Sequence, residues 1–153
     1  MSPTENKLTV KKSSDWVPKM LAWADQKFTY FGYFTSQEIA YPSGGFEHVL
    51  YAGTKAVSLE NMHQLPPDKP KVGILSYDQK NKYEKLSSHN IETIDCPDSL
   101  FFSPELVINI GRELITIEGE TPAETLAEIL ATHPLKGKKG GDCTINCSHD
   151  EKS

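Results

Sequence analysis

Two short apolar runs separated by three residues constrain the fold of this chain more than any other feature. Leu106–Ile110 and residues 114–117 flank the turn Gly111-Arg112-Glu113. Aliphatic runs of this length, joined by a turn in which glycine supplies an unusual backbone angle, are typical of a β-hairpin. A third run, Val72–Leu75, is too short for a helix and predicts another strand. The middle of the chain is therefore expected to be sheet.

Two segments outside this region have helical spacing. The first follows Ser13-Ser14-Asp15, a candidate cap, and its apolar positions three or four residues apart are Trp16, Met20, Trp23 and Ala24. The second begins with Thr121-Pro122-Ala123-Glu124, which has the pattern of a capping box with proline in the first turn. Its expected buried stripe is Leu126, Ile129 and Leu130. Strands and helices in separate segments predict an α+β fold, an antiparallel or mixed sheet with peripheral helices.

Further strands are expected on the N-terminal side of the sheet region. Residues 28–35 are rich in aromatic side chains on both faces, and Gly32 indicates a bulge or the close approach of another backbone. Residues 46–52 alternate, and the turn at Gly53-Thr54 predicts a hairpin with residues 55–59. Residues 61–70 contain three prolines and are expected to form an irregular connector.

Composition excludes several functional classes. A chain of 153 residues is expected to form one domain with a real core. Its net charge of -5 argues against a nucleic-acid or anionic-membrane surface. It contains no apolar run of membrane-spanning length, and the polar first nine residues do not resemble a signal sequence. Three unevenly spaced cysteines, Cys96, Cys143 and Cys147, predict no disulfide framework, which fits a reducing cytoplasm best.

The sequence G-I-L-S-Y-D-Q-K-N-K-Y-E-K-L at residues 73–86 is followed by P-x-x-L-F-F-S-P-E at residues 97–105. Together they resemble the N-terminal domain of component I of aminodeoxychorismate (para-aminobenzoate) synthase, a relative of anthranilate synthase component I. Within this pattern we expect Asp78 to cap the following segment and Tyr77 to pack beneath it. The resemblance covers residues 8–132, nearly the whole chain.

The resemblance implies a division of the chain and a parent reaction. Residues 1–12 are a flexible start or an edge strand, residues 13–134 the N-terminal domain, and residues 135–153 a linker and the beginning of a chorismate-binding domain. The family aminates chorismate toward p-aminobenzoate and folate, with Mg²⁺ and with ammonia from a glutamine amidotransferase subunit. The catalytic residues belong to the chorismate-binding domain, so none is assigned here. We expect a truncated, non-catalytic portion that self-associates through an uncovered apolar face.

One small-molecule site is also implied by the resemblance. Domains of this family can hold a tryptophan, and the matching positions here are Ser36, Ser43, Gly44, Gly45 and Phe46. Gly45 stands where the family pattern has arginine, so one charged donor is missing. Ser36 and backbone N–H groups near the glycines could receive a carboxylate while Phe46 stacks on an indole. The alternative at these positions is an ordinary loop rich in turn residues.

The remaining residue patterns do not predict a metal site or a catalytic nucleophile. Cys143, Cys147 and His149 are zinc-ligand types, but their spacing is unusual and a solvent-exposed tail is favoured, so no metal or cofactor is expected in this chain. No histidine has an adjacent serine or cysteine together with a positioning acid that the sequence can identify, so no nucleophile is indicated. The alternative function is a free-standing module that binds a tryptophan-like ligand or recruits a partner protein.

Overall fold

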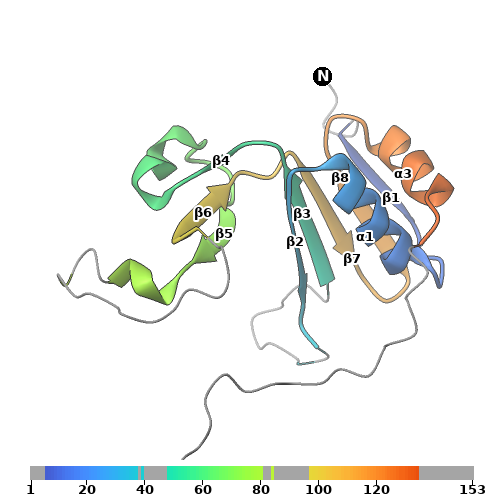
Figure 1. The fold of residues 1–153 in the computed structure, drawn as a ribbon. Coiled ribbons are helices and arrows are strands. Elements are labelled where there is room, and N and C mark those ends of the chain that lie inside the picture. Colours follow the sequence, from blue (N-terminus) through green and yellow to red (C-terminus); the bar gives the residue numbers. More distant parts are fainter. Residues whose placement is uncertain (1–5, 38, 40–47, 81–83, 85–96, 135–153) are drawn as a thin grey trace, which may run out of the picture.

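Five antiparallel strands form the larger of two sheets (Figure 1). The computed structural model describes residues 6–37, 39, 48–80, 84 and 97–134. In the order in which they lie side by side, the strands are β1 Lys7–Lys11, β8 Leu114–Glu118, β7 Leu106–Ile110, β3 His48–Gly53 and β2 Tyr30–Thr35. Strands β1 and β2 therefore form the two edges of this sheet.

The hairpin predicted first is confirmed as β7 and β8. Ile108 is paired with Ile117, and Ile110 with Ile115, so their side chains lie on one face. The N–H of Gly111 donates to the carbonyl of Leu114 at 2.9 Å and closes the turn. Gly111 does not adopt the left-handed conformation, but a Cβ there would lie 3.2 Å from the Leu114 oxygen. Glycine therefore provides space in this turn.

Both described α-helices cover the same face of the larger sheet, as Figure 1 shows: α1 Trp16–Lys27 and α3 Pro122–Ala131. The helical residues expected to be buried in α1 are confirmed, with Trp16 and Trp23 exposed by 1% and 5%. They pack on aliphatic side chains from the central strands. The buried cluster consists of Trp16, Met20, Trp23, Ala24, Leu50, Ala52, Leu106, Ile108, Ile110, Ile115, Ile117 and Ile129.

The smaller sheet has three antiparallel strands in the order β4-β6-β5. Its strands are β4 Ala56–Val57, β6 Ser99–Phe102 and β5 Val72–Leu75. It lies beyond β2 and β3, on the side away from the helices (Figure 1). The Phe102 ring stacks on Tyr30, with ring centres 6.2 Å apart, and so joins β6 to the larger sheet. The mixed arrangement of antiparallel sheets and few helices confirms the α+β class.

The predicted hairpin between residues 46–52 and 55–59 is wrong. Strand β3 pairs with β2 on one side and β7 on the other, so it has no free edge for β4. The chain instead passes through Thr54 into the smaller sheet, where Ala56 is opposite Phe102. Only residues 56–57 of the expected second strand are extended. The 3-10 helix Leu59–Gln64 follows and overlaps the end of that expected strand and the start of the expected connector.

Gly32 is neither a bulge nor a point of contact with another backbone. The β2–β3 register is unbroken through it, with Gly32 opposite Tyr51. A Cβ at Gly32 would lie 2.8 Å from the Phe34 ring and 3.5 Å from a Val72 methyl group. The glycine therefore makes room for two side chains at the junction of the sheets. The Phe34 side chain is 41% exposed, so not all aromatic side chains of this strand are covered.

The expected helix caps are corrected as well. Neither Asp15 nor Thr121 makes a side-chain cap hydrogen bond, because neither has the extended backbone of a typical cap residue. Asp15 instead pairs with Lys19 at 3.0 Å, and the hydrogen bond from Lys19 lowers the pKa of the Asp15 carboxyl. In the second helix Leu130, which was expected to be buried, is 48% exposed, whereas Thr125 is buried.

Glu128 joins the two helices. Its carboxylate accepts a hydrogen bond from the indole N–H of Trp23 at 2.8 Å and pairs with Lys27 at 2.9 Å. The hydrogen bonds from Lys27 and, second, from Trp23 lower the pKa of Glu128 from its ordinary value of 4.5. The side chain is 42% exposed, so solvent screens the pair.

We expect replacement of Glu128 by alanine to lower the free energy of unfolding by about 1 kcal/mol at neutral pH. The pKa of Glu128 is lower in the folded state than in the unfolded state. The charged carboxylate therefore stabilises the fold above pH 4.5, and this stabilisation is lost as the pH falls through the folded-state pKa. Glu128→Gln keeps an acceptor for Trp23 but no charge. Urea titrations at several pH values should therefore show the wild type approaching Glu128→Gln in acid; a pH-independent difference between the two would contradict this assignment.

Candidate functional site

Ser36, the first of the five predicted ligand residues, lies immediately after β2. It is partly buried, and its carbonyl accepts a hydrogen bond from the N–H of Ile39 at 3.0 Å. Gln37 has a positive φ of 48°, which turns the chain away from the strand direction. Ser43, Gly44, Gly45 and Phe46 lie outside the described residues. The tryptophan-like site therefore stays a prediction, and only its serine is placed.

A tyrosine–histidine pair near Ser36 was missed in the sequence. The rings of Tyr33 and His48 are stacked, with centres 6.0 Å apart, and the Tyr33 hydroxyl is 3.3 Å from His48 Nδ1. Burial raises the pKa of the Tyr33 hydroxyl, which keeps the group neutral and able to donate. The two side chains are on the helix-covered face, in diagonally adjacent positions of β2 and β3. Only the strand register reveals this contact, so no local pattern in the sequence indicates it.

The second predicted feature, the Ser76-Tyr77-Asp78 segment, has different roles from those expected. Ser76 caps the 3-10 helix Tyr77–Gln79, because its Oγ accepts a hydrogen bond from the Asp78 N–H at 3.2 Å. Most of the segment 79–86 that Asp78 was expected to cap lies outside the described residues. Tyr77 does not pack beneath the segment: it is 79% exposed, and Lys80 Nζ lies 3.8 Å from its ring centre. The carboxylate of Asp78 is thereby left at the surface. The sequence identifies Ser76 as a possible cap residue, but Asp78 is an equally good candidate because serine and aspartate are both favoured at cap positions.

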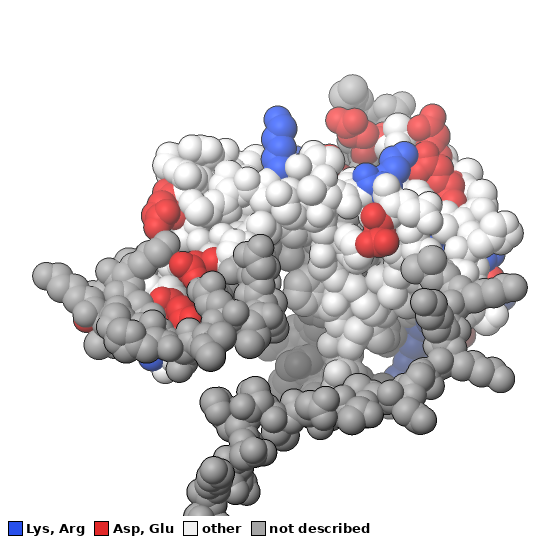
Figure 2. Space-filling view, in the orientation of Figure 1, with Lys and Arg blue, Asp and Glu red and all other residues white. Residues whose placement is uncertain are grey.

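Three large apolar side chains within residues 74–77 are exposed. Ile74, Leu75 and Tyr77 are 47%, 57% and 79% exposed, and we call them the Tyr77 surface. They fall inside the sequence 73–86 that carries the family resemblance. In Figure 2 the described Lys and Arg side chains on the visible face form small separate groups, so no broad basic field lies on this face.

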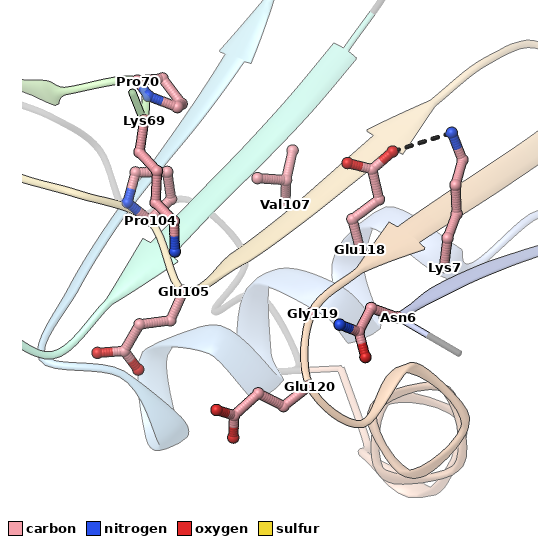
Figure 3. Close-up of a pocket in the computed structure, with 10 residues that line it drawn as sticks. All are labelled: Asn6, Lys7, Lys69, Pro70, Pro104, Glu105, Val107, Glu118, Gly119 and Glu120. Carbon is pink, nitrogen blue, oxygen red and sulfur yellow. Dashed lines mark ion pairs between the residues drawn. The ribbon is translucent and has the colours of Figure 1, made fainter. Parts of the chain in front are cut away.

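A groove of about 470 Å³ lies between the two sheets, where β1, β7 and β8 approach the connector before β5 (Figure 3). Val107 contributes to its floor, and Lys7 and Glu118 form an ion pair at 3.0 Å along one wall. Glu105 precedes β7 and accepts a hydrogen bond from the Thr54 hydroxyl. The described residues that line the groove carry charges of both signs but include no histidine, cysteine or hydroxyl side chain, so the groove offers ion pairing.

The described residues contain neither a candidate metal centre nor a candidate membrane span. No three His, Cys, Asp or Glu side chains there are grouped as metal ligands, and the candidate zinc residues Cys143, Cys147 and His149 lie outside that part. No helix in the same part combines the length and apolar character needed to cross a bilayer. Comparison with known proteins found no matching family model and no matching curated protein.

Proposed function

We propose that this chain is the N-terminal, non-catalytic portion of an aminodeoxychorismate synthase component I. In the proposal it serves as a scaffold on which a chorismate-binding domain packs. That domain would contribute the residues for chorismate and Mg²⁺, and a glutamine amidotransferase subunit would supply ammonia. The sequence resemblance at residues 73–86 and 97–105 supports the family.

The Tyr77 surface is the observation that carries the proposal. Soluble domains generally cover large apolar side chains that are adjacent in sequence and in space. Here Ile74, Leu75 and Tyr77 are exposed within four residues, next to a short three-stranded sheet. The Phe34 ring, which lies beside Gly32 and near Val72, is also partly exposed. Alternate residues of a strand share a face, so the apolar area next to Phe34 is that of Val72 and Ile74, whereas Leu75 lies on the opposite face of β5. A packed domain would remove this area from water.

The experiment is a titration of the chain with a separately produced chorismate-binding domain of such an enzyme, followed by NMR. We expect resonances of the Tyr77 surface and Phe34 to change, and Tyr77→Asp to weaken the complex about tenfold or more, because a central aromatic contact is lost. Tyr77→Asp should leave folding intact, since the side chain is 79% exposed. Leu130→Lys, at an equally apolar site on α3, is the matched control. Equal binding by Tyr77→Asp and wild type would refute the assignment of this surface.

A further inference from the structure

Strands β3 and β7 of the larger sheet continue into β4 and β6 of the smaller sheet without a change of register. Ala52 is opposite Leu106 in the larger sheet, and Ala56 is opposite Phe102 in the smaller one. The same number of residues therefore separates the two pairs on both strands, and one two-stranded ribbon joins the sheets (Figure 1). The intervening residues, which we call the ribbon bend, are 53–55 and 103–105.

The backbone ladder is irregular in the ribbon bend. Pro104 has no N–H and cannot donate a ladder hydrogen bond. The Glu105 N–H donates to the Ala52 carbonyl at 2.8 Å, although the residue opposite Ala52 is Leu106, so this bond is one residue out of register. The residues of the ribbon bend are therefore not fixed to one another by the regular ladder that holds the strands on either side of them.

A side-chain hydrogen bond crosses the ribbon bend. The Thr54 hydroxyl donates to the Glu105 carboxylate, and both residues are exposed. A hydrogen bond at the surface exchanges with water and contributes little net free energy. This contact is therefore strong enough to favour one angle between the sheets but too weak to lock it.

The sheets also make contact at the level of the ribbon bend. Tyr30, which is opposite Gly53, stacks on Phe102 with ring centres 6.2 Å apart. Val72, which is opposite Phe102, lies next to Gly32. These side chains are near the axis of any rotation at the bend, so the smaller sheet can turn without separating them.

The groove between the sheets gives the smaller sheet room to turn. Its volume is about 470 Å³, and Pro104 and Glu105 of the ribbon bend are among its lining residues. Lys69 lines it from the connector before β5, whereas Val107 and Glu118 line it from the larger sheet (Figure 3). A rotation at the bend therefore changes the distance between two walls that come from different sheets.

We propose that the ribbon bend is a hinge, about which the smaller sheet turns toward the larger sheet and narrows the groove. Hinges are typically a few residues at the ends of secondary-structure elements, as here. The Thr54–Glu105 hydrogen bond favours the angle seen in the structure. Because β5 runs from Val72, beside the bend, to Leu75, opposite Ser99, the hinge sets where the Tyr77 surface lies relative to the larger sheet. The hinge is a property of this chain alone and does not depend on the proposed function.

The test measures residual dipolar couplings of backbone amides in the full chain by NMR, separately for the strands of the two sheets. Sheets that move relative to each other have different alignment tensors, and we expect a smaller tensor magnitude for the smaller sheet. Thr54→Val should enlarge this difference, because it removes the donor while keeping the shape of the side chain. The loss of one exposed hydrogen bond is expected to change the equilibrium between the two angles about fivefold.

Thr9→Val is the matched control. The Thr9 hydroxyl lies 3.3 Å from that of Thr116, so this variant removes a similar exposed hydrogen bond within the larger sheet instead of across the bend. It should leave the difference between the sheets as in the wild type. One tensor that fits both sheets of the wild type would overturn the hinge, and this comparison needs no variant to fold. An unchanged difference in Thr54→Val would overturn the role of the Thr54–Glu105 bond.

Discussion

Replacing Trp16 by alanine should lower the free energy of unfolding by about 3–5 kcal/mol. The indole is 1% exposed at the start of α1 and belongs to the buried cluster between this helix and the larger sheet. Its removal leaves a cavity that the sheet residues cannot fill, because their positions are fixed by the ladder. A domain of this size has about 5–15 kcal/mol of stability in total, so urea denaturation should show a much lower midpoint.

Trp16→Phe is the matched control for this prediction. The indole Nε1 is buried and has no hydrogen-bond partner among the residues that the structure describes. A buried unpaired donor costs about 1–3 kcal/mol, so phenylalanine gains from losing the donor while it loses part of the packed ring. We expect Trp16→Phe to be destabilised far less than Trp16→Ala. Equal losses for the two variants would show that the indole N–H makes a hydrogen bond.

Replacing Gly73 by alanine should detach β5 from β6, with a cost of about 3 kcal/mol. A Cβ at this position would lie 2.0 Å from the Leu100 carbonyl oxygen and 2.8 Å from the Phe101 Cα. Both are main-chain atoms, so no side-chain rotation relieves the overlap and the strand itself must move. Amide resonances of Val72–Leu75 should therefore shift while those of the larger sheet remain.

Gly119→Ala is the control for Gly73→Ala. The nearest atom to a Cβ at Gly119 is a methyl carbon of Leu106 at 3.0 Å, at the end of a flexible side chain. A small adjustment of that side chain accommodates the methyl group, so the loss of stability should stay below that of Gly73→Ala. If Gly73→Ala unfolds at the same denaturant concentration as the wild type, the close packing of β5 on β6 is contradicted.

Local signals predicted the elements whose partners are close in sequence. The β7–β8 hairpin and the buried residues of α1 needed only a turn glycine and helical spacing. The hairpin assigned to residues 46–59 failed because the turn at Gly53-Thr54 carries no information about which strand edges are free. Strand β3 is paired with β7, more than fifty residues later, and a contact of this range cannot be read from local spacing.

The candidate site was predictable to a smaller extent. Ser36 does follow an aromatic strand, but the Tyr33–His48 contact depends on the register between two strands that residues 36–47 separate in the sequence. The exposure of Tyr77 could not be predicted either, because an aromatic residue next to a strand is more often buried. The functional proposal rests on residues such as Tyr77, whose exposure differs from what the local sequence predicts.

The central claim, that this chain supplies a scaffold and the reacting residues lie in another domain, is tested most directly by one product assay. The purified chain is incubated with chorismate, Mg²⁺ and ammonium, alone and with the chorismate-binding domain used in the titration, and aminodeoxychorismate is measured by mass spectrometry. The account predicts no product from the chain alone and an increase in product when the chain is added to that domain. Aminodeoxychorismate formed by this chain alone would contradict it.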